Sequence, residues 1–412
     1  MKTFVSKFLK IVAVFAVVLA TFASNREDAQ AAMYQSAESD YEYEIKKSGV
    51  TITKYTGLSL QQVMEENYSV VVPEEIAGKK VTSIAPYAFA EQKRISEFVL
   101  PQTITSIGAH AFYNCQGMTS VKLPSSLKKI GEFAFYNTQI KKISIPKKVK
   151  SIGNYAFGCD KTVLNPVTTE VSVNKSNKKF TAADGALYNK SKSQLIYYPG
   201  AKKGKTYTAT SKLKSMSKWA FHDAMRLENV SLSKSKITSI SENAFQIATL
   251  KKISFPKTLK KIGAHAFEKS GVTAIAIPQN VASIGEAAFY NCSNLKKVTI
   301  SSKKLTVLPN DIFASCRFLT SVTLPESLTA IGEGAFNNCI SLKKITIPKK
   351  VTSIGDRAFR LCEALTTVTI KGTVTHIGYS AFDGDPNLTI IAKKGTYPES
   401  FAKQKNISFK KL

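Results

Sequence analysis

Hydrophobic residues recur along this chain in two short patterns, each repeated about every 23 residues. The first pattern is Ile-Gly-x-x-Ala-Phe, as in residues 107–112. Its last residue recurs at intervals of 22 to 24 residues, apart from one gap of 64 residues. Such self-similarity at a fixed period indicates a repeat protein. The anchor phenylalanines are Phe89, Phe112, Phe135, Phe157, Phe221, Phe245, Phe267, Phe289, Phe313, Phe336, Phe359 and Phe382.

The second pattern, Leu-x-x-Ile/Val-x-Ile/Leu, lies between the anchors and is often followed by proline, as in residues 342–348. Its alternation of apolar and polar residues predicts a short strand, because successive side chains of a strand point to opposite faces. The proline then ends the strand. One coil of this kind cannot enclose its own apolar side chains, so the coils are expected to stack into a rod.

These units resemble the BspA-like, or Treponema-type, leucine-rich repeats over about residues 40–410. The resemblance implies an α/β repeat solenoid. This is a right-handed leucine-rich-repeat coil with a parallel β-sheet along one face and mostly irregular or short helical and strand segments opposite. It also implies a surface or secreted protein, as members of the family typically are, and several of them are regarded as adhesins for host matrix proteins or other cells. The segment from Phe180 to Pro199 is similar to an irregular insertion common in the family, and Gly395–Ala402 resembles its C-terminal cap.

The gap between Phe157 and Phe221 exceeds one unit by about 41 residues, which is room for about two irregular coils. Two strands are expected within it, at 186–188 and 195–198, around a turn at 189–193. Such an interruption can be a ligand-binding protrusion or a spacer between two stacks, and the spacer interpretation is favoured. The predicted organisation is a signal peptide (1–31), an N-terminal β-rich cap (32–82), a first repeat stack (83–157), an irregular insertion or degenerate repeats (158–214), a second stack (215–390) and a C-terminal cap (391–412).

The first 31 residues have the three regions of a signal peptide. Lysines come first, an apolar run follows over 11–20, and Ala29-Gln30-Ala31 forms a cleavage site. The apolar run is shorter than the roughly 20 residues that span a bilayer. We therefore expect export, with no transmembrane segment after cleavage, and a secreted, extracellular or loosely cell-surface-associated protein of bacterial type. The chain closes without a Leu-Pro-x-Thr-Gly motif, so any attachment to the wall is expected to be noncovalent.

The formal charge is +29, and about +27 without residues 1–31. Such a charge attracts anionic partners over long range and in a salt-dependent way. Lysine supplies nearly all of it, since the chain has six arginines among 58 basic residues. Arginine is the residue suited to bidentate contacts with bases, so sequence-specific nucleic-acid recognition is not expected. The expected partner is an extracellular protein or an anionic polymer, such as a wall polymer or an acidic glycan. A role in solubility alone stays open.

The reactive side chains give little support to catalysis. Five of the six cysteines stand three residues after an anchor phenylalanine, which favours a ladder of buried thiols over disulfides or a metal site. His110 and His265 share a repeat position, while His222 and His376 do not, so no cluster of histidine with cysteine or carboxylate is predicted. Gly-rich phosphate loops, HExxH and GxSxG are absent from the sequence. The sequence therefore predicts binding, with no catalytic residue, metal or cofactor.

The outward residues of the predicted strands alternate between lysine and a small residue, coil by coil. One column runs Lys252, Ala274, Lys297, Ser321, Lys344, Thr367, and the column before it runs Lys251, Thr273, Lys296, Thr320, Lys343, Thr366. Avoidance of like charges on neighbouring strands, a regularly charged polyanion or acidic protein surface, and descent from a doubled unit all explain this alternation. Few aromatic residues occupy this face, which counts against stacking on sugars or bases. The candidate binding residues are Lys142, Lys252, Lys297, Ser321, Lys344 and Thr367.

The hypothesis that follows is an extracellular adhesion protein that uses a basic strand face to hold a protein or an anionic polymer. The alternative is a structural scaffold, associated noncovalently with the wall, that has no specific host ligand.

Overall fold

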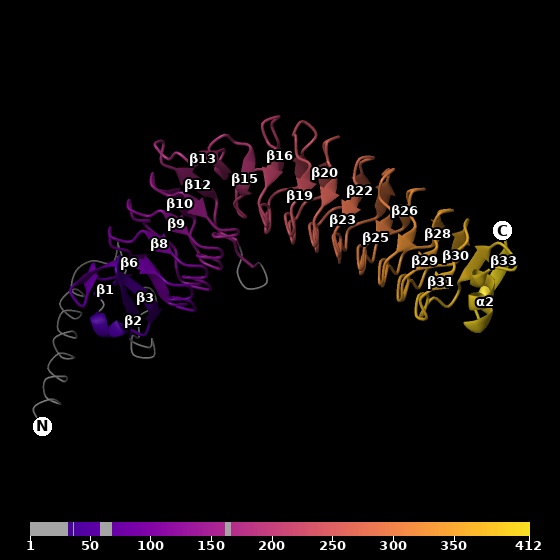
Figure 1. Cartoon of the computed structure of the whole chain (residues 1–412), viewed down its shortest axis with the longest axis horizontal. Coiled ribbons are helices and arrows are strands. Elements are labelled where there is room, and N and C mark those ends of the chain that lie inside the picture. Colours follow the sequence, from indigo (N-terminus) through magenta and orange to yellow (C-terminus); the bar gives the residue numbers. More distant parts are fainter. Residues whose placement is uncertain (1–31, 36, 58–67, 161–165) are drawn as a thin grey trace, which may run out of the picture.

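The computed structural model describes residues 32–35, 37–57, 68–160 and 166–412. Its coils stack side by side along one curved rod (Figure 1), and the predicted solenoid is confirmed. The predicted signal peptide at 1–31 lies outside the described residues. Within these four ranges, no helix has both the length and the apolar character needed to cross a membrane.

The Leu-x-x-Ile motif forms a first column of parallel strands along the rod. In β28 (Lys344–Ile347), Ile345 and Ile347 are buried while Lys344 and Thr346 are exposed, as the alternation predicts. Hydrogen bonds group the column into separate ladders. The ladders are β1 (Ala32–Gln35), β4 (Tyr68–Val71), β7 (Ile95–Val99); β10 (Lys142–Ile145), β12 (Glu170–Val173); β16 (Thr206–Thr208), β18 (Asn229–Ser231), β20 (Lys252–Ser254); β22 (Ala274–Ile277), β24 (Lys297–Ile300), β26 (Ser321–Thr323); and β28, β30 (Thr367–Ile370), β32 (Thr389–Ala392), β33 (Ser408–Lys411).

The residues before the corner glycine form a second column of mostly two-residue parallel strands, which the sequence pattern did not separate from the first. The glycine is needed because the preceding coil lies against it: a Cβ on Gly355 would stand 2.6 Å from the backbone nitrogen of Glu333. The strands are β6 (Lys79–Ile84), β8 (Ser106–Ile107), β9 (Lys129–Ile130), β11 (Ser151–Ile152), β17 (Ser215–Met216), β19 (Ser239–Ile240), β21 (Lys261–Ile262), β23 (Ser283–Ile284), β25 (Val307–Leu308), β27 (Ala330–Ile331), β29 (Ser353–Ile354) and β31 (His376–Ile377).

Turns, and hardly any helix, complete each coil. Among the described residues, helix is confined to α2 (Tyr397–Gln404) in the C-terminal cap and the 3-10 turn η1 (Glu38–Asp40). The anchor phenylalanines point inward and stack ring on ring. From Phe245 through Phe267, Phe289, Phe313 and Phe336, successive ring centroids lie 5.0, 5.1, 5.5 and 5.5 Å apart. This ladder forms the spine of the core and sets the distance from one coil to the next.

The N-terminal cap contains a pair of strands next to the first coil. They form an antiparallel hairpin, β2 (Tyr41–Lys46) and β3 (Gly49–Tyr55), and β3 pairs in parallel with β6 to start the second column. The two-residue strand β5 (Glu75–Ile76) pairs with the beginning of β6. The hairpin thus covers the first coil.

The insertion interrupts the hydrophobic core but not the stack. It contains an antiparallel meander, β13 (Phe180–Ala183), β14 (Ala186–Asn189) and β15 (Gln194–Tyr197), and the last two are the strands that the sequence predicts. Because β15 pairs in parallel with β17, it takes the place of a second-column strand. Tyr197 packs in the core of the first stack and Tyr198 in that of the second, so two consecutive tyrosines divide the core.

Candidate binding surface

The structure places all six candidate binding residues in one column. Each is the first residue of a first-column strand: β10, β20, β24, β26, β28 or β30. The register aligns Lys297 with Ala274 on one side and Ser321 on the other, and it aligns Lys344 with Thr367. We call the outward side chains of the first column from β20 to β30 the lysine face.

The threonines that alternate with lysine have a structural role. The hydroxyl of Thr273 donates to the Lys251 carbonyl at 3.3 Å, that of Thr320 to the Lys296 carbonyl at 3.1 Å, and that of Thr366 to the Lys343 carbonyl at 3.1 Å. Each bond therefore joins one coil to the lysine of the coil before it. A lysine side chain has no short hydroxyl to make this bond. Part of the alternation is therefore explained by hydrogen bonds between stacked coils, without any ligand.

Carboxylates separate the candidate lysines into two groups. Lys142 lies 3.7 Å from Glu170 on the next strand, and Glu228 pairs with Lys205 at 2.9 Å and Lys251 at 3.0 Å. The hydrogen bonds from these two lysines lower the pKa of Glu228. In the described part of the chain, no carboxylate lies within ion-pair distance of Lys252, Lys297 or Lys344. These three lysines keep an uncompensated charge, whereas the charge of Lys142 is compensated by Glu170.

A column of hydroxyls runs beside the lysines, two residues further along each strand. It consists of Ser254, Thr299, Thr323, Thr346 and Thr369, with Ala276 as its one apolar member from β20 to β30. These side chains are exposed or half-buried, and the register places Thr299 beside Thr323 and Thr346 beside Thr369. The lysine face thus offers two kinds of polar group in two parallel columns.

Aromatic rings gather away from the lysine face, at the residue two before the anchor phenylalanine. His110 is stacked between Tyr87 and Phe133, with centroids 4.6 and 5.0 Å apart, and burial lowers its pKa. His265 occupies the same repeat position, and its ring Nδ1 donates to the Glu268 carboxylate at 2.8 Å. Both histidines have a left-handed backbone, with φ of +58° and +54°. The repeat role inferred from their equivalence agrees with this geometry.

His222, for which the sequence predicted no cluster, also lies against one carboxylate. Its ring lies 2.8 Å from the carboxylate of Asp223, and the Tyr155 hydroxyl contacts both side chains. The same hydroxyl donates to the carbonyl of Cys159 at 2.7 Å. All of these groups are buried at the junction of the two stacks, so they tie the last coil of one stack to the first coil of the next. The sequence did not predict this junction contact, because the insertion separates Tyr155 from His222 along the chain.

The cysteine ladder is present as expected, and all six cysteines are buried thiols. Each ladder thiol donates to the carbonyl of an earlier anchor phenylalanine: Cys115 to Phe89 at 3.0 Å and Cys292 to Phe267 at 3.0 Å. Cys316, Cys339 and Cys362 repeat the contact. Burial raises the pKa of the Cys115 thiol to about 12. Among the described residues, no group of three or more histidine, cysteine or carboxylate side chains is arranged to hold a metal ion.

Burial of these thiols predicts that the native protein resists alkylation. At pH 8 a thiol reagent is expected to modify none of the six cysteines in the folded chain and all six after unfolding in guanidinium chloride, because only the exposed thiolate reacts. Phe318→Cys is the matched control, since Phe318 is 56% exposed and its replacement should react at once. Rapid labelling of any native cysteine would contradict the buried ladder.

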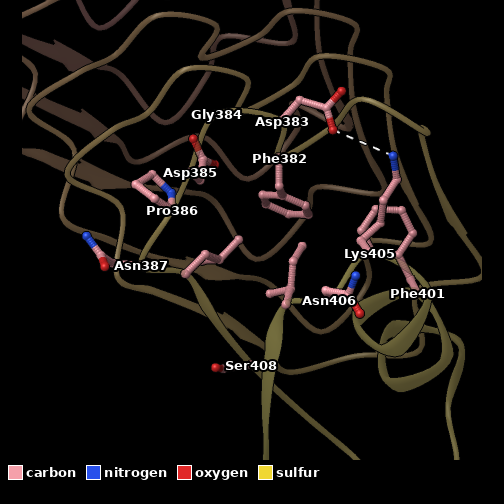
Figure 2. A pocket seen from close by; sticks show the side chains of 12 residues that line it. Phe382, Asp383, Gly384, Asp385, Pro386, Asn387, Phe401, Lys405, Asn406 and Ser408 are labelled. Carbon is pink, nitrogen blue, oxygen red and sulfur yellow. Dashed lines mark ion pairs between the residues drawn. The ribbon is translucent and has the colours of Figure 1, made fainter.

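A pocket of about 720 Å³ lies where the last coil meets the C-terminal cap (Figure 2). In it, Asp383 reaches toward Lys405 at 3.6 Å, while Asp385 stands apart. Asp385 follows Phe382 by three residues and so occupies the ladder position that cysteine fills in earlier coils. One carboxyl oxygen accepts the N–H of Cys362 at 2.7 Å, and the other is buried without a hydrogen-bond partner. Burial raises the pKa of Asp385 to about 8. Ser408 and Asp385 lie away from the Asp383–Lys405 pair.

Comparison with known proteins settles the family. The BspA type leucine rich repeat region matches in six copies, over residues 82–186, 198–296 and 260–389. This chain belongs to the BspA-type leucine-rich repeat family. The matched residues cover most of both BspA-type stacks and reach into the insertion. The same segments carry the anchor phenylalanines, so the resemblance stated from the sequence is confirmed.

Solved structures share the BspA-type fold of this chain. A leucine-rich repeat protein from Bacteroides ovatus is 24% identical with a TM-score of 0.56, covering 94% of this chain and 94% of its own. One from Eubacterium ventriosum is 26% identical with a TM-score of 0.55, covering 78% and 93%. The pneumococcal vaccine antigen PcpA is 20% identical with a TM-score of 0.54, covering 86% and 91%. A search of curated proteins gives no significant match.

Proposed function

We propose that this BspA-type protein is a secreted or cell-surface binding protein that holds an anionic polymer through its lysine face. The observation that carries the proposal is the column of Lys252, Lys297 and Lys344, exposed and without a paired carboxylate in the described structure. Cations that recur along a stacked rod can engage a linear polyanion at several points at once, and each contact adds affinity without further ordering of the backbone.

Two further features support a polymer over a catalytic substrate. The family is built of repeats whose exposed faces serve as extended binding surfaces. In the pocket at the C-terminal cap, Lys405 pairs with Asp383 while Asp385 and Ser408 lie away from that pair, whereas a reaction would require acid, base and nucleophile close together. A linear ligand also suits this rod better than a globular ligand does, because equivalent side chains recur along the whole length of the rod. An acidic protein surface is the competing ligand for the same face.

The proposal is tested by comparing two triple variants of equal net charge on heparin and on anionic cell-wall material. Lys252→Ser/Lys297→Ser/Lys344→Ser is expected to lower the slope of log affinity against log salt by about 2 to 3, roughly one for each lost ion contact. The control, Lys190→Ser/Lys203→Ser/Lys212→Ser, changes exposed lysines in the insertion and should leave that slope nearly unchanged. Equal losses in both variants would mean that net charge alone acts, as in a wall-associated scaffold.

A further inference from the structure

The lysine face has a repeat distance that the core fixes. The stacked phenylalanine rings place successive coils 5.0 to 5.5 Å apart from Phe245 to Phe336. Neighbouring strands in a sheet have nearly the same separation, about 4.8 Å. Lysines on alternate coils therefore recur at about 10 Å, with one small side chain halfway between them.

An extended polysaccharide has the same two periods. In a chain of equatorially linked pyranose rings, each sugar advances by nearly the distance from one coil to the next. A carboxylate carried by every second sugar then recurs at nearly the distance between Lys252 and Lys297, or between Lys297 and Lys344. A match between two periods lets every charge of the ligand meet a cation without bending either partner, which keeps the entropic cost of binding low.

We propose that the ligand of the lysine face is an extended acidic polysaccharide with one carboxylate on every second sugar, lying across the strands with one sugar over each coil. This inference rests on the proposed function and specifies its polymer. The uncharged sugars then lie over Ala274, Ser321 and Thr367, which are the small members of the same column. Small side chains at these positions leave room for a ring that carries no charge.

The hydroxyl column supplies the second set of contacts. Thr299, Thr323 and Thr346 lie beside the lysines, about 7 Å further along each strand. A threonine hydroxyl both donates and accepts hydrogen bonds, as sugar hydroxyls do. The lysine face carries no aromatic ring from β20 to β30 at these outward positions, so the polymer is held by ion pairs and hydrogen bonds instead of stacking.

A polymer with a charge on every sugar fits this face less well than its higher charge suggests. Every second carboxylate would lie over Ala274, Ser321 or Thr367 and would find no cation there. Such a group loses part of its hydration without gaining an ion pair. Selectivity between the two polymers is a difference of binding free energies, and here the unmatched charges supply that difference.

Three hexasaccharides test the inference at physiological salt. A hyaluronan hexamer has a carboxylate on alternate sugars, a mannuronate hexamer has one on every sugar, and cellohexaose has none. Titration calorimetry is expected to give a hyaluronan affinity at least equal to that for mannuronate, with little binding of cellohexaose. Since Lys252 and Lys344 are four coils apart, or about 20 Å, affinity should rise from the disaccharide to the hexamer and then level off. An affinity that simply follows the number of carboxylates would overturn the inference.

A variant with added lysines tests the match of periods more directly. Ala274→Lys/Ser321→Lys fills the gaps between the three lysines and is expected to shift the affinity ratio toward mannuronate by about fivefold. Both positions are exposed and lie beside Lys297 in the register, so circular dichroism must first show that the variant keeps the fold. An unchanged ratio would overturn the match of periods. If neither acidic hexamer binds while heparin retention still depends on the three lysines, the sugar class is wrong and the proposed function stands. If heparin retention does not depend on them, the proposed function itself fails.

Discussion

Replacing Phe313 by alanine is expected to lower the free energy of unfolding by about 3 to 5 kcal/mol. The Phe313 ring is fully buried and stacks between Phe289 and Phe336 at 5.5 Å on each side. Truncation removes the transfer free energy of one large ring and leaves a cavity that both neighbouring coils border. In a linear stack each coil is stabilised by its two neighbours, so the loss weakens two interfaces at once.

The matched control is Phe318→Ala in the same coil. Phe318 is 56% exposed, and its truncation is expected to change stability by about 0.5 kcal/mol or less. Urea unfolding followed by circular dichroism measures both variants against the parent chain. Similar midpoints for the two variants would show that the phenylalanine ladder does not form the spine of the core. A second unfolding transition in Phe313→Ala would show that the coils on either side of the lost ring unfold separately.

Replacing Asp385 by asparagine is expected to leave stability nearly unchanged near pH 4 and to stabilise the protein increasingly as pH rises from 4 to 8. Burial raises the folded-state pKa of Asp385 to about 8, whereas an unfolded aspartate titrates near 3.9. Between these values the folded state binds one more proton than the unfolded state. The stability contributed by this proton is complete below about pH 4 and is lost as pH rises through 8, with a slope of up to about 1.4 kcal/mol per pH unit.

Asparagine keeps the oxygen that accepts the Cys362 N–H and adds a neutral donor. In the cysteine ladder, the thiol of Cys362 donates to the Phe336 carbonyl, so the equivalent acceptor for a donor at position 385 is the carbonyl of Phe359. The stabilisation at pH 8 should be about 2 kcal/mol, since the side chain borders an open pocket and is partly screened. Guanidinium titrations of both chains at pH 4, 6 and 8 measure the difference. A difference that does not vary with pH would place the pKa of Asp385 in its usual range.

Some site features had a sequence signal that the repeat alignment makes plain afterwards. Asp385 stands three residues after Phe382, as Cys362 does after Phe359. Reading the ladder position through the last coil would have placed a carboxyl among buried thiols. The threonines that alternate with lysine, Thr273, Thr320 and Thr366, were visible in the sequence too. Their hydrogen bonds to carbonyls of the preceding coil could not be predicted, because residue spacing along the chain does not give the distance between coils.

Other features depend on contacts between distant residues. Glu170 compensates Lys142 across 28 positions of sequence because the irregular coil still pairs β12 with β10. Tyr155 meets His222 and Asp223 only because the meander folds back and brings two stacks together. Such contacts follow from the path of the insertion, and its residues lack the periodicity that made the regular coils predictable.

The sequence by itself determined the coil, its anchors and the columns of outward side chains. Each repeat must bury the same residues, so spacing and alternation were enough to specify them. The tertiary structure alone decided which lysines keep an uncompensated charge, how the two stacks join, and that a second column of strands lies beside the first. The reason is physical: burial imposes a period on the sequence of every coil, whereas ion pairs and junction contacts arise once, between side chains that only the folded stack brings within reach.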